Sequence, residues 1–191
     1  GINLNTNIEF SEDSIKGQFI YSKPNFAYTD NTLFTSVKSQ TTDNLTNFGY
    51  KQSDIGFSLG TRFEQYENVF FSPEIDFSLE EIETNSTASA SRKKQEGNYE
   101  DFYFNYGLRY DLRNSSYKPT AGSSTYFYQE LPIVSGNNEI GNTFVYTKYK
   151  SLNDASDMVG KASFYFKAIN SIDGSDVRIS KRGQVPYHRL R

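Results

Sequence analysis

"FYFNYGLRYDLRNSSYKPTAGSSTYFYQEL", residues 102–131, alternates in residue type at both of its ends and is rich in turn-forming residues between them. In its first half, aromatic residues and leucines recur at every second position, and polar or charged residues, including Asn105, Arg109 and Asp111, lie between them. Successive side chains of a β-strand point to opposite faces of the sheet, so this period predicts a strand with one apolar face. The stretch therefore predicts two strands joined by a turn.

The same period of two runs along most of the chain. No segment shows a convincing helical period, and the pattern predicts an all-β fold of about nine strands. The expected strands lie in residues 2–11, 15–21, 33–37, 55–63, 69–80, 102–112, 123–134, 139–152 and 158–171.

Composition excludes several classes of protein. The 191 residues include no cysteine, which rules out a disulfide scaffold and a cysteine-based zinc site. A net charge of -3 gives no basic field for nucleic acid. The mean hydropathy is low, at -0.68, yet 15 tyrosines and 16 phenylalanines argue against a disordered polar chain. No apolar run is long enough for a transmembrane helix.

Two architectures share this alternation. In a soluble sandwich the apolar face is the packed core, whereas in an outer-membrane barrel it meets lipid and the polar face lines the lumen. The expected strands are long enough to cross a bilayer with tilt, and full charges recur at strand centres, which favours the barrel. In that case Glu74, Asp76, Arg109 and Asp111 face the lumen. The residues expected to face lipid are Ile2, Phe10, Phe57, Phe77, Phe104, Leu108 and Phe144.

The connections between the strands suggest two different rims. Residues 84–98 form a long polar stretch, whereas residues 153–157 are a minimal link. Long loops on one rim and tight turns on the other are typical of a transmembrane barrel, with the tight turns in the periplasm. This reading places residues 114–122 and 153–157 in the periplasm and residues 84–98 and 135–138 outside. Because nine is odd, we expect residues 1–191 to be one incomplete, antiparallel up-and-down barrel domain, ending in a long loop over residues 173–191.

Residues 104–139 resemble the barrel domain of the outer-membrane protein assembly factor family, BamA and its relatives. The family has a strand that ends in Tyr, then Asp or Asp-Leu-Arg, and then an aromatic-x-Pro-Thr-x-Gly turn in the periplasm. Here these positions are Tyr110, Asp111, Arg113, Tyr117, Pro119, Thr120 and Gly122. Such a turn must be tight and fixed, because Pro119 restricts φ and Gly122 permits a left-handed corner.

Two further segments are similar to the same family. Residues 20–34, "IYSKPNFAYTDNTLF", are similar to its Asn-Pro-aromatic turn, with the order changed to Pro-Asn-Phe. The final "PYHRLR" looks like the approach to its Arg-Gly-aromatic motif, at the tip of a long loop that folds back into the lumen. The resemblance implies that Arg191 is the motif arginine and that it pairs with an acidic residue on a strand beyond this chain.

The resemblance also implies a function. The family folds and inserts other β-barrel proteins into the outer membrane of Gram-negative bacteria, without nucleotide or metal, so we expect no cofactor. The implied partners are the outer-membrane lipid bilayer and lipopolysaccharide, unfolded outer-membrane proteins as substrates, and the lipoproteins of the assembly machinery, with no nucleic acid. A passive or substrate-specific diffusion channel and a secretion pore of the same superfamily are the alternatives.

Enzymatic chemistry finds little support in the sequence. His188 is the lone histidine and lies in the C-terminal tail, and no G-x-S-x-G elbow or calcium loop is present. The alternating acids at 74, 76, 80 and 81 are interpreted as solvated wall, and the sequons at Asn44, Asn85 and Asn114 as chance. The basic residues 92–94 could meet lipopolysaccharide phosphates, but a charged loop tip is the simpler reading. We therefore predict that the chain is not an enzyme.

Overall fold

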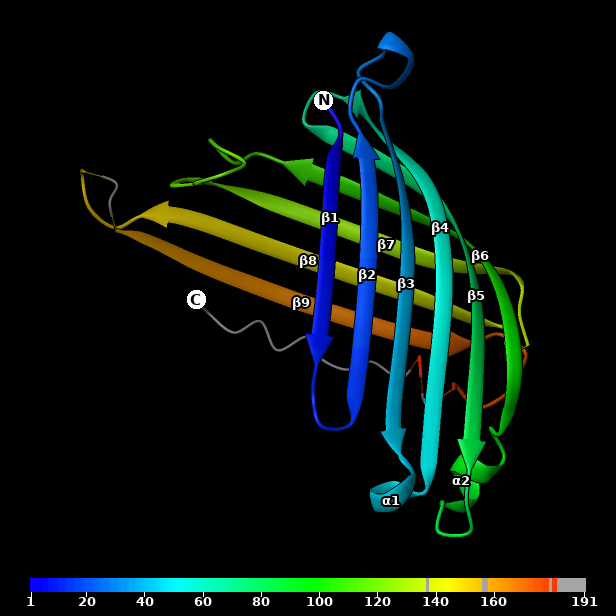
Figure 1. The fold of residues 1–191 in the computed structure, drawn as a ribbon. Helices are drawn as coiled ribbons and strands as arrows, with labels where there is room; N and C mark the ends of the chain where they lie inside the picture. The colour runs from blue at the N-terminus through cyan, green and yellow to red at the C-terminus, as the bar shows by residue number, and fades with distance from the viewer. Residues whose placement is uncertain (137, 156–157, 179, 182–191) are drawn as a thin grey trace.

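The computed structural model is one open, curled sheet of nine antiparallel strands in sequence order, β1 to β9 (Figure 1). It describes residues 1–136, 138–155, 158–178 and 180–181. The strands are β1 Asn3–Phe10, β2 Ser14–Lys23, β3 Thr32–Asn44, β4 Tyr50–Tyr66, β5 Val69–Thr84, β6 Gly97–Asp111, β7 Gly122–Val134, β8 Glu139–Ser151 and β9 Val159–Ser171. The all-β prediction and the number of strands are confirmed.

Several strands run further than the alternation of the sequence predicted. β4 has 17 residues, β5 has 16 and β3 has 13, although the apolar period marked only residues 33–37 of β3. Beyond Val37 the side chains of β3 on the apolar side are Ser39 and Thr41, so the pattern fades while the backbone pairing with β4 continues. Backbone hydrogen bonding therefore extends strands past the point where side-chain contrast ends.

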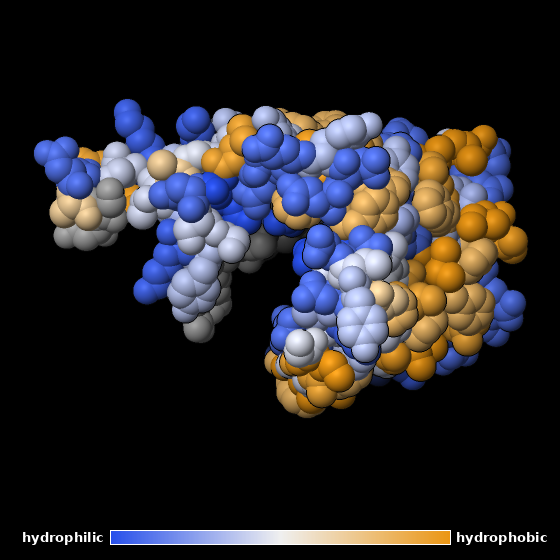
Figure 2. Space-filling model, turned by 90° about the horizontal axis from the view of Figure 1, so that it is seen from above, coloured by the Kyte–Doolittle hydropathy of each residue, from blue (hydrophilic) through white to orange (hydrophobic). Residues whose placement is uncertain are grey.

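The sheet is curved, and its two faces are opposite in character. Neighbours in sequence show the contrast: Phe77 is 43% exposed on the convex face, whereas the side chain of Asp76 is 15% exposed on the concave face. The buried residues of the sheet are mostly polar, with Asp101 at 1%. In a space-filling view from above, hydrophobic residues gather along the outer side of the curve (Figure 2). This inverted distribution is that of a membrane barrel wall.

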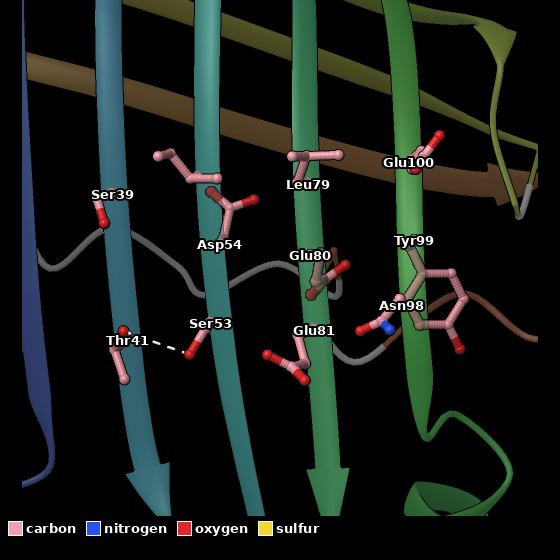
Figure 3. A pocket seen from close by; sticks show the side chains of 11 residues that line it. Ser39, Thr41, Ser53, Asp54, Leu79, Glu80, Glu81, Asn98, Tyr99 and Glu100 are labelled. Atoms are coloured by element: carbon pink, nitrogen blue, oxygen red, sulfur yellow. Dashed lines mark hydrogen bonds between the residues drawn. The ribbon is translucent and has the colours of Figure 1, made fainter.

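The side chains expected to face lipid share the convex face. Phe57 pairs with Phe77 in register, and Leu108 pairs with Phe127. Toward one rim the same face turns polar, because Thr41, Ser53, Glu81 and Asn98 occupy one register row (Figure 3). The apolar band of the wall therefore ends before it reaches this row.

A ladder of polar side chains crosses the convex face within the apolar band. The Tyr106 hydroxyl donates to Oε1 of Gln129 at 2.8 Å, and Nε2 of Gln129 donates to Oδ1 of Asn142 at 2.7 Å. The neighbouring positions of β6 on this face are Phe104 and Leu108. Polar groups that face lipid are costly unless they bond to one another, and this ladder links β6, β7 and β8 through side chains.

The connections near residues 84–98 and 135–138 share one rim and those near 114–122 and 153–157 the other, as expected, but the expectation that long connections gather on one rim is wrong. One rim, here called the loop rim, carries residues 11–13, 45–49, 85–96 and 135–138, and the opposite turn rim carries residues 24–31, 67–68, 112–121 and 152–158. Each rim therefore has both short and long connections. The length of a connection does not indicate its rim here. Residues 112–121 are many but form a compact, internally hydrogen-bonded turn, and part of 85–96 folds into the short helix α2, Ala90–Lys93.

The loop rim is a folded structure made by two connections. The short helix α1, Leu45–Phe48, ends at Gly49, whose backbone carbonyl accepts from Asn85 N at 2.9 Å. The guanidinium of Arg92 lies over the ring of Tyr50 at 4.3 Å and donates to the Phe48 carbonyl at 3.1 Å. Arg92 thus links the two connections through these contacts.

Candidate functional site

The predicted turn motif lies at the turn rim, between β6 and β7. Arg113 forms a two-pronged ion pair with Asp111, with Nε to Oδ1 at 2.7 Å and Nη2 to Oδ2 at 2.5 Å. Tyr110 precedes the pair and is 47% exposed on the convex face. Tyr117 lies at the exposed tip of the connection. Asp111 and Arg113 therefore fix the strand end, while Tyr110 lies on the convex face and Tyr117 is exposed in the connection.

Asn114 holds the rest of this turn together. Its Oδ1 accepts from the backbone N–H groups of Thr120 at 3.0 Å and Ala121 at 3.1 Å, and its Nδ2 donates to the Thr120 hydroxyl at 2.7 Å. The sequence reading treated Asn114 as part of a chance sequon. An asparagine followed by Ser-Ser is, however, a residue type that bonds to nearby backbone and shapes turns.

Gly122 is required where the turn enters β7. Its φ is +95°, and a Cβ there would lie 2.0 Å from the carbonyl oxygen of Leu112 and 2.9 Å from Cα of Arg113. Both the backbone conformation and the missing Cβ therefore favour glycine at this position. Pro119 and Thr120, both partly buried, lie in the part of the turn that leads back to Gly122.

After β9 the chain folds back onto the concave face and places Arg178 against the inner wall. Arg178 is fully buried. Its Nη1 donates to Oε2 of Glu80 at 3.0 Å, its Nη2 donates to Oδ2 of Asp101, and its backbone N–H donates to Oε1 of Glu139 at 2.6 Å. The guanidinium also lies 4.7 Å from the ring centre of Tyr99. Three strands, β5, β6 and β8, thus supply one carboxylate each.

The charges at this anchor do not balance. Arg178 and Lys181 face three carboxylates, and Lys181 lies over the ring of Tyr103 at 4.9 Å. Oε2 of Glu139 is buried without a hydrogen-bond partner among the described residues. Buried charges are tolerated when they are paired, and removal of one partner leaves an uncompensated charge. Arg178 is therefore the group that makes this acidic wall compatible with burial (Figure 3 shows Glu80 and Tyr99 on β5 and β6).

The base of the same segment is held by Asp173. Its carboxylate accepts from the Ser171 hydroxyl at 2.7 Å and from the backbone N–H groups of Ser175 at 2.9 Å and Asn138 at 3.2 Å. Hydrogen bonds from the side chain and backbone of Ser175, with those from Ser171 and Asn138, hold the pKa of the Asp173 carboxyl well below its usual range. This clasp joins the end of β9 to the connection between β7 and β8.

Comparison with known proteins identifies the family. The model of the Omp85 superfamily domain matches residues 1–183. The chain belongs to the Omp85 superfamily. Among solved structures, this Omp85 chain is similar to the crystal structure of BamA from Haemophilus ducreyi lacking POTRA domains 1-3, with 23% sequence identity and a TM-score of 0.74. A search of the curated proteins found no significant match.

The match to that structure covers 93% of this chain and 37% of that chain. The chain therefore spans well under half of the length of the structure that it matches. The likeness confirms the expected fold class, the wall of an antiparallel up-and-down transmembrane β-barrel that is not closed in this chain. No helix of the described Omp85 residues is long and apolar enough to cross a membrane.

The other residues predicted for the site have different outcomes. Arg191, the expected motif arginine, and His188 lie outside the described residues, so the role of Arg191 stays a prediction. Glu80 was interpreted as solvated wall, and this is wrong, because it is 5% exposed and paired with Arg178. The signal for Arg178 was a Val-Arg-Ile triplet within a polar tail, which is too short to reveal a strand or a partner.

Candidate metal ligands do not converge in the part of the Omp85 chain that the structure describes. No group of three or more histidine, aspartate or glutamate side chains there is placed to hold a metal ion. Of the three carboxylates around Arg178, those of Glu80 and Asp101 bind its guanidinium, and that of Glu139 binds its backbone N–H. What this site can do is mechanical, since it fixes a connecting segment to the inner wall.

Proposed function

We propose that this Omp85 chain is part of an outer-membrane assembly factor that folds and inserts other β-barrel proteins. The observation that carries the proposal is the segment 172–178, which folds back onto the concave face and is fixed there by Arg178. A passive diffusion channel needs an open lumen, whereas this segment fills part of it. Membership of the Omp85 superfamily supports the same choice.

The mechanism we infer is physical rather than covalent. An unpaired strand edge in lipid is costly, so an edge of the complete barrel would pair with an incoming strand by backbone hydrogen bonds. The residues described above would keep the remaining wall in register while that edge opens. We expect no enzyme activity and no cofactor to be needed.

The proposed location is the outer membrane of a Gram-negative bacterium, with the turn rim in the periplasm. The convex face would meet lipid, and the loop rim would meet lipopolysaccharide. Unfolded outer-membrane proteins would be the substrates, and lipoproteins of the assembly machinery the accessory partners. The inverted distribution of polar and apolar residues supports the membrane location.

A secretion pore of the same superfamily is the second candidate. The anchored segment suits it as well, because such a pore must stay closed until its cargo arrives. The two candidates differ in what leaves the membrane, since an assembly factor releases a folded barrel into the bilayer and a secretion pore passes its cargo across.

Reconstitution tests the proposal directly. The full-length protein would be placed in liposomes, a urea-unfolded β-barrel protein added, and folding followed by heat-modified mobility on a gel. We expect faster folding than in empty liposomes or in liposomes with an unrelated barrel. Folding at the rate of empty liposomes would contradict the proposal. Steady ion conductance in that case would favour the channel, and protected cargo inside the vesicles would favour secretion.

A further inference from the structure

A row of aromatic side chains ends the apolar band of the convex face toward the turn rim. Tyr110 of β6, Tyr146 of β8 and Phe164 of β9 are exposed there. Thr125 of β7 lies in register between Tyr110 and Tyr146, and Phe164 pairs with Tyr146. Exposed aromatic residues gather in this way at the membrane–water interface of transmembrane barrels. The row therefore marks the depth of the lipid headgroups on β6 to β9.

Two lysines of β8 lie on the same face, just beyond this row. Lys148 pairs with Ala162 of β9, which is small and exposed. Lys150 pairs with Gly160, and the Leu152 side chain lies beside that glycine. Residues two apart on a strand point to the same face and are about 7 Å apart. Both ammonium groups can therefore reach one anionic group placed at Ala162.

The charge at this end of the strands is positive. Both lysines are exposed, and neither forms an ion pair with a residue that the structure describes. Asp154, in the adjoining connection, is exposed and likewise forms no such pair. Over residues 110–125 and 146–164 the sequence has five basic residues and three acidic ones, and this count includes Asp157, which lies outside the described residues. The acids therefore do not neutralise the lysines.

The strands carry the opposite charge where the convex face approaches the loop rim. Glu81, Glu83 and Glu100 are exposed there on β5 and β6. Lys51 of β4 pairs with Glu83, whereas the register partners of Glu81 are serine and asparagine. Of the two ends of this lipid-exposed face, the strands therefore favour an anion at the turn rim.

We propose that Lys148 and Lys150 bind the phosphate of an anionic phospholipid in the leaflet at the turn rim. Lysine binds phosphate as a point charge, and lysines at a bilayer surface attract anionic lipids. The Ser123 hydroxyl, in register with Lys148, is a further donor. The exposed ring of Phe164 continues the same surface into the apolar band, beside the acyl chains of that lipid. A phosphate that carries acyl chains matches both features, whereas free phosphate matches only the lysines.

This inference rests on the proposed location in the outer membrane and adds the chemical class of a bound lipid. With the turn rim in the periplasm, the lipid belongs to the leaflet that faces the periplasm. A phosphate held by β8 would fix the depth of β8 and β9 in the membrane. The site does not require that the protein inserts other barrels, so the two proposals can fail separately.

Quenching by spin-labelled lipids tests the site in the full-length protein in liposomes. A bimane fluorophore would be attached to a cysteine introduced by Phe164→Cys. The liposomes are phosphatidylcholine with a trace of nitroxide-labelled phosphatidylglycerol or of phosphatidylcholine that carries the nitroxide at the same acyl position. The variants are Lys148→Gln/Lys150→Gln and, as a control of equal charge change at the loop rim, Lys51→Gln/Lys94→Gln. Folding of each variant is checked on a semi-native gel in detergent, where Lys148 and Lys150 have no ion pair to lose.

We expect the labelled phosphatidylglycerol to quench the fluorophore about fivefold more strongly than the labelled phosphatidylcholine at equal content. The Lys148→Gln/Lys150→Gln variant should lose this preference, and the loop-rim variant should keep it. Equal quenching by the two lipids, or equal loss in both variants, would overturn the site. Loss of the preference on addition of excess inorganic phosphate would also overturn it, because the lysines would then bind free phosphate. Failure of the liposome folding assay with a retained lipid preference would count against the assembly function alone.

Discussion

At the scale of single residues, Gly122 and Arg178 carry the most distinct constraints in this wall. Gly122 adopts a backbone conformation with φ of +95°, which L-residues with a side chain rarely adopt, and its missing Cβ leaves room for the Leu112 carbonyl. Arg178 is a fully buried cation whose partners come from three strands. Each residue is therefore difficult to replace, for reasons of backbone in the first case and of charge in the second.

Replacement of Gly122 by alanine should destabilise the barrel. The added Cβ would overlap backbone atoms that cannot rotate away, and strain of this kind costs about 1–3 kcal/mol. Gly17→Ala is the matched control, because it also lies in a strand and a Cβ there meets nothing within 4 Å. Urea unfolding of the refolded full-length protein would measure both. Equal midpoints for the two variants would show that the turn is not tightly constrained.

Replacement of Arg178 by alanine should cost about 3–5 kcal/mol, the usual effect of removing one partner from a buried ion pair. Arg178→Lys should lose less, since it keeps the charge but not the fork that spans Glu80 and Asp101. The temperature at which the band shifts on a semi-native gel reports the change, with Lys148→Ala as a surface control. If alanine at 178 behaves like the control, the anchor does not hold the segment.

At the scale of elements, one prediction concerns the ladder of hydrogen-bonded side chains that joins β6, β7 and β8. Gln129→Leu leaves the Tyr106 hydroxyl and the Asn142 amide without their partner on the apolar face. We expect a loss of about 1–2 kcal/mol. The triple variant Tyr106→Phe/Gln129→Leu/Asn142→Leu should be closer to the natural protein, because no polar group then remains unpaired. A triple variant that is less stable than the single one in the same unfolding assay would contradict this reading.

The elements also show how far sequence reasoning reaches. The positions of the strands and the faces of residues such as Phe77 and Asp76 could be predicted, because a period of two is a local property of the chain. The full length of β3 could not, since Ser39 and Thr41 carry no apolar signal. The turn motif was found through Pro119, Thr120 and Gly122, but Asn114, which bonds to the returning chain, was missed.

The Arg178 anchor lies beyond such local reasoning. Glu80, Asp101 and Glu139 are far apart in sequence, and each reads as an ordinary polar position of its own strand. Only the strand order and the curvature of the sheet bring them to one arginine. The length of a connection could not predict its rim for a similar reason, because hydrogen bonds inside residues 112–121 make a long connection compact.

At the scale of the whole molecule, the central feature is that polarity is inverted relative to a soluble protein. The convex face exposes aromatic and aliphatic side chains (Figure 2). The concave face buries carboxylates, hydroxyls and one arginine. The assignment of lipid to one face and lumen to the other follows from this distribution. The Arg178 anchor depends on it, because it lies on the concave face.

The most direct test of that assignment uses spin labels at neighbouring positions of one strand. The chain has no cysteine, so single cysteines at Phe77 and Asp76, and at Phe57 and Ser58, can be labelled one at a time in the full-length protein in liposomes. Oxygen, which concentrates in lipid, should relax the labels at 77 and 57 most. A water-soluble nickel complex should reach those at 76 and 58 more readily. Labels at 77 and 57 that favour the nickel complex, or no alternation between neighbours, would contradict the membrane-barrel account.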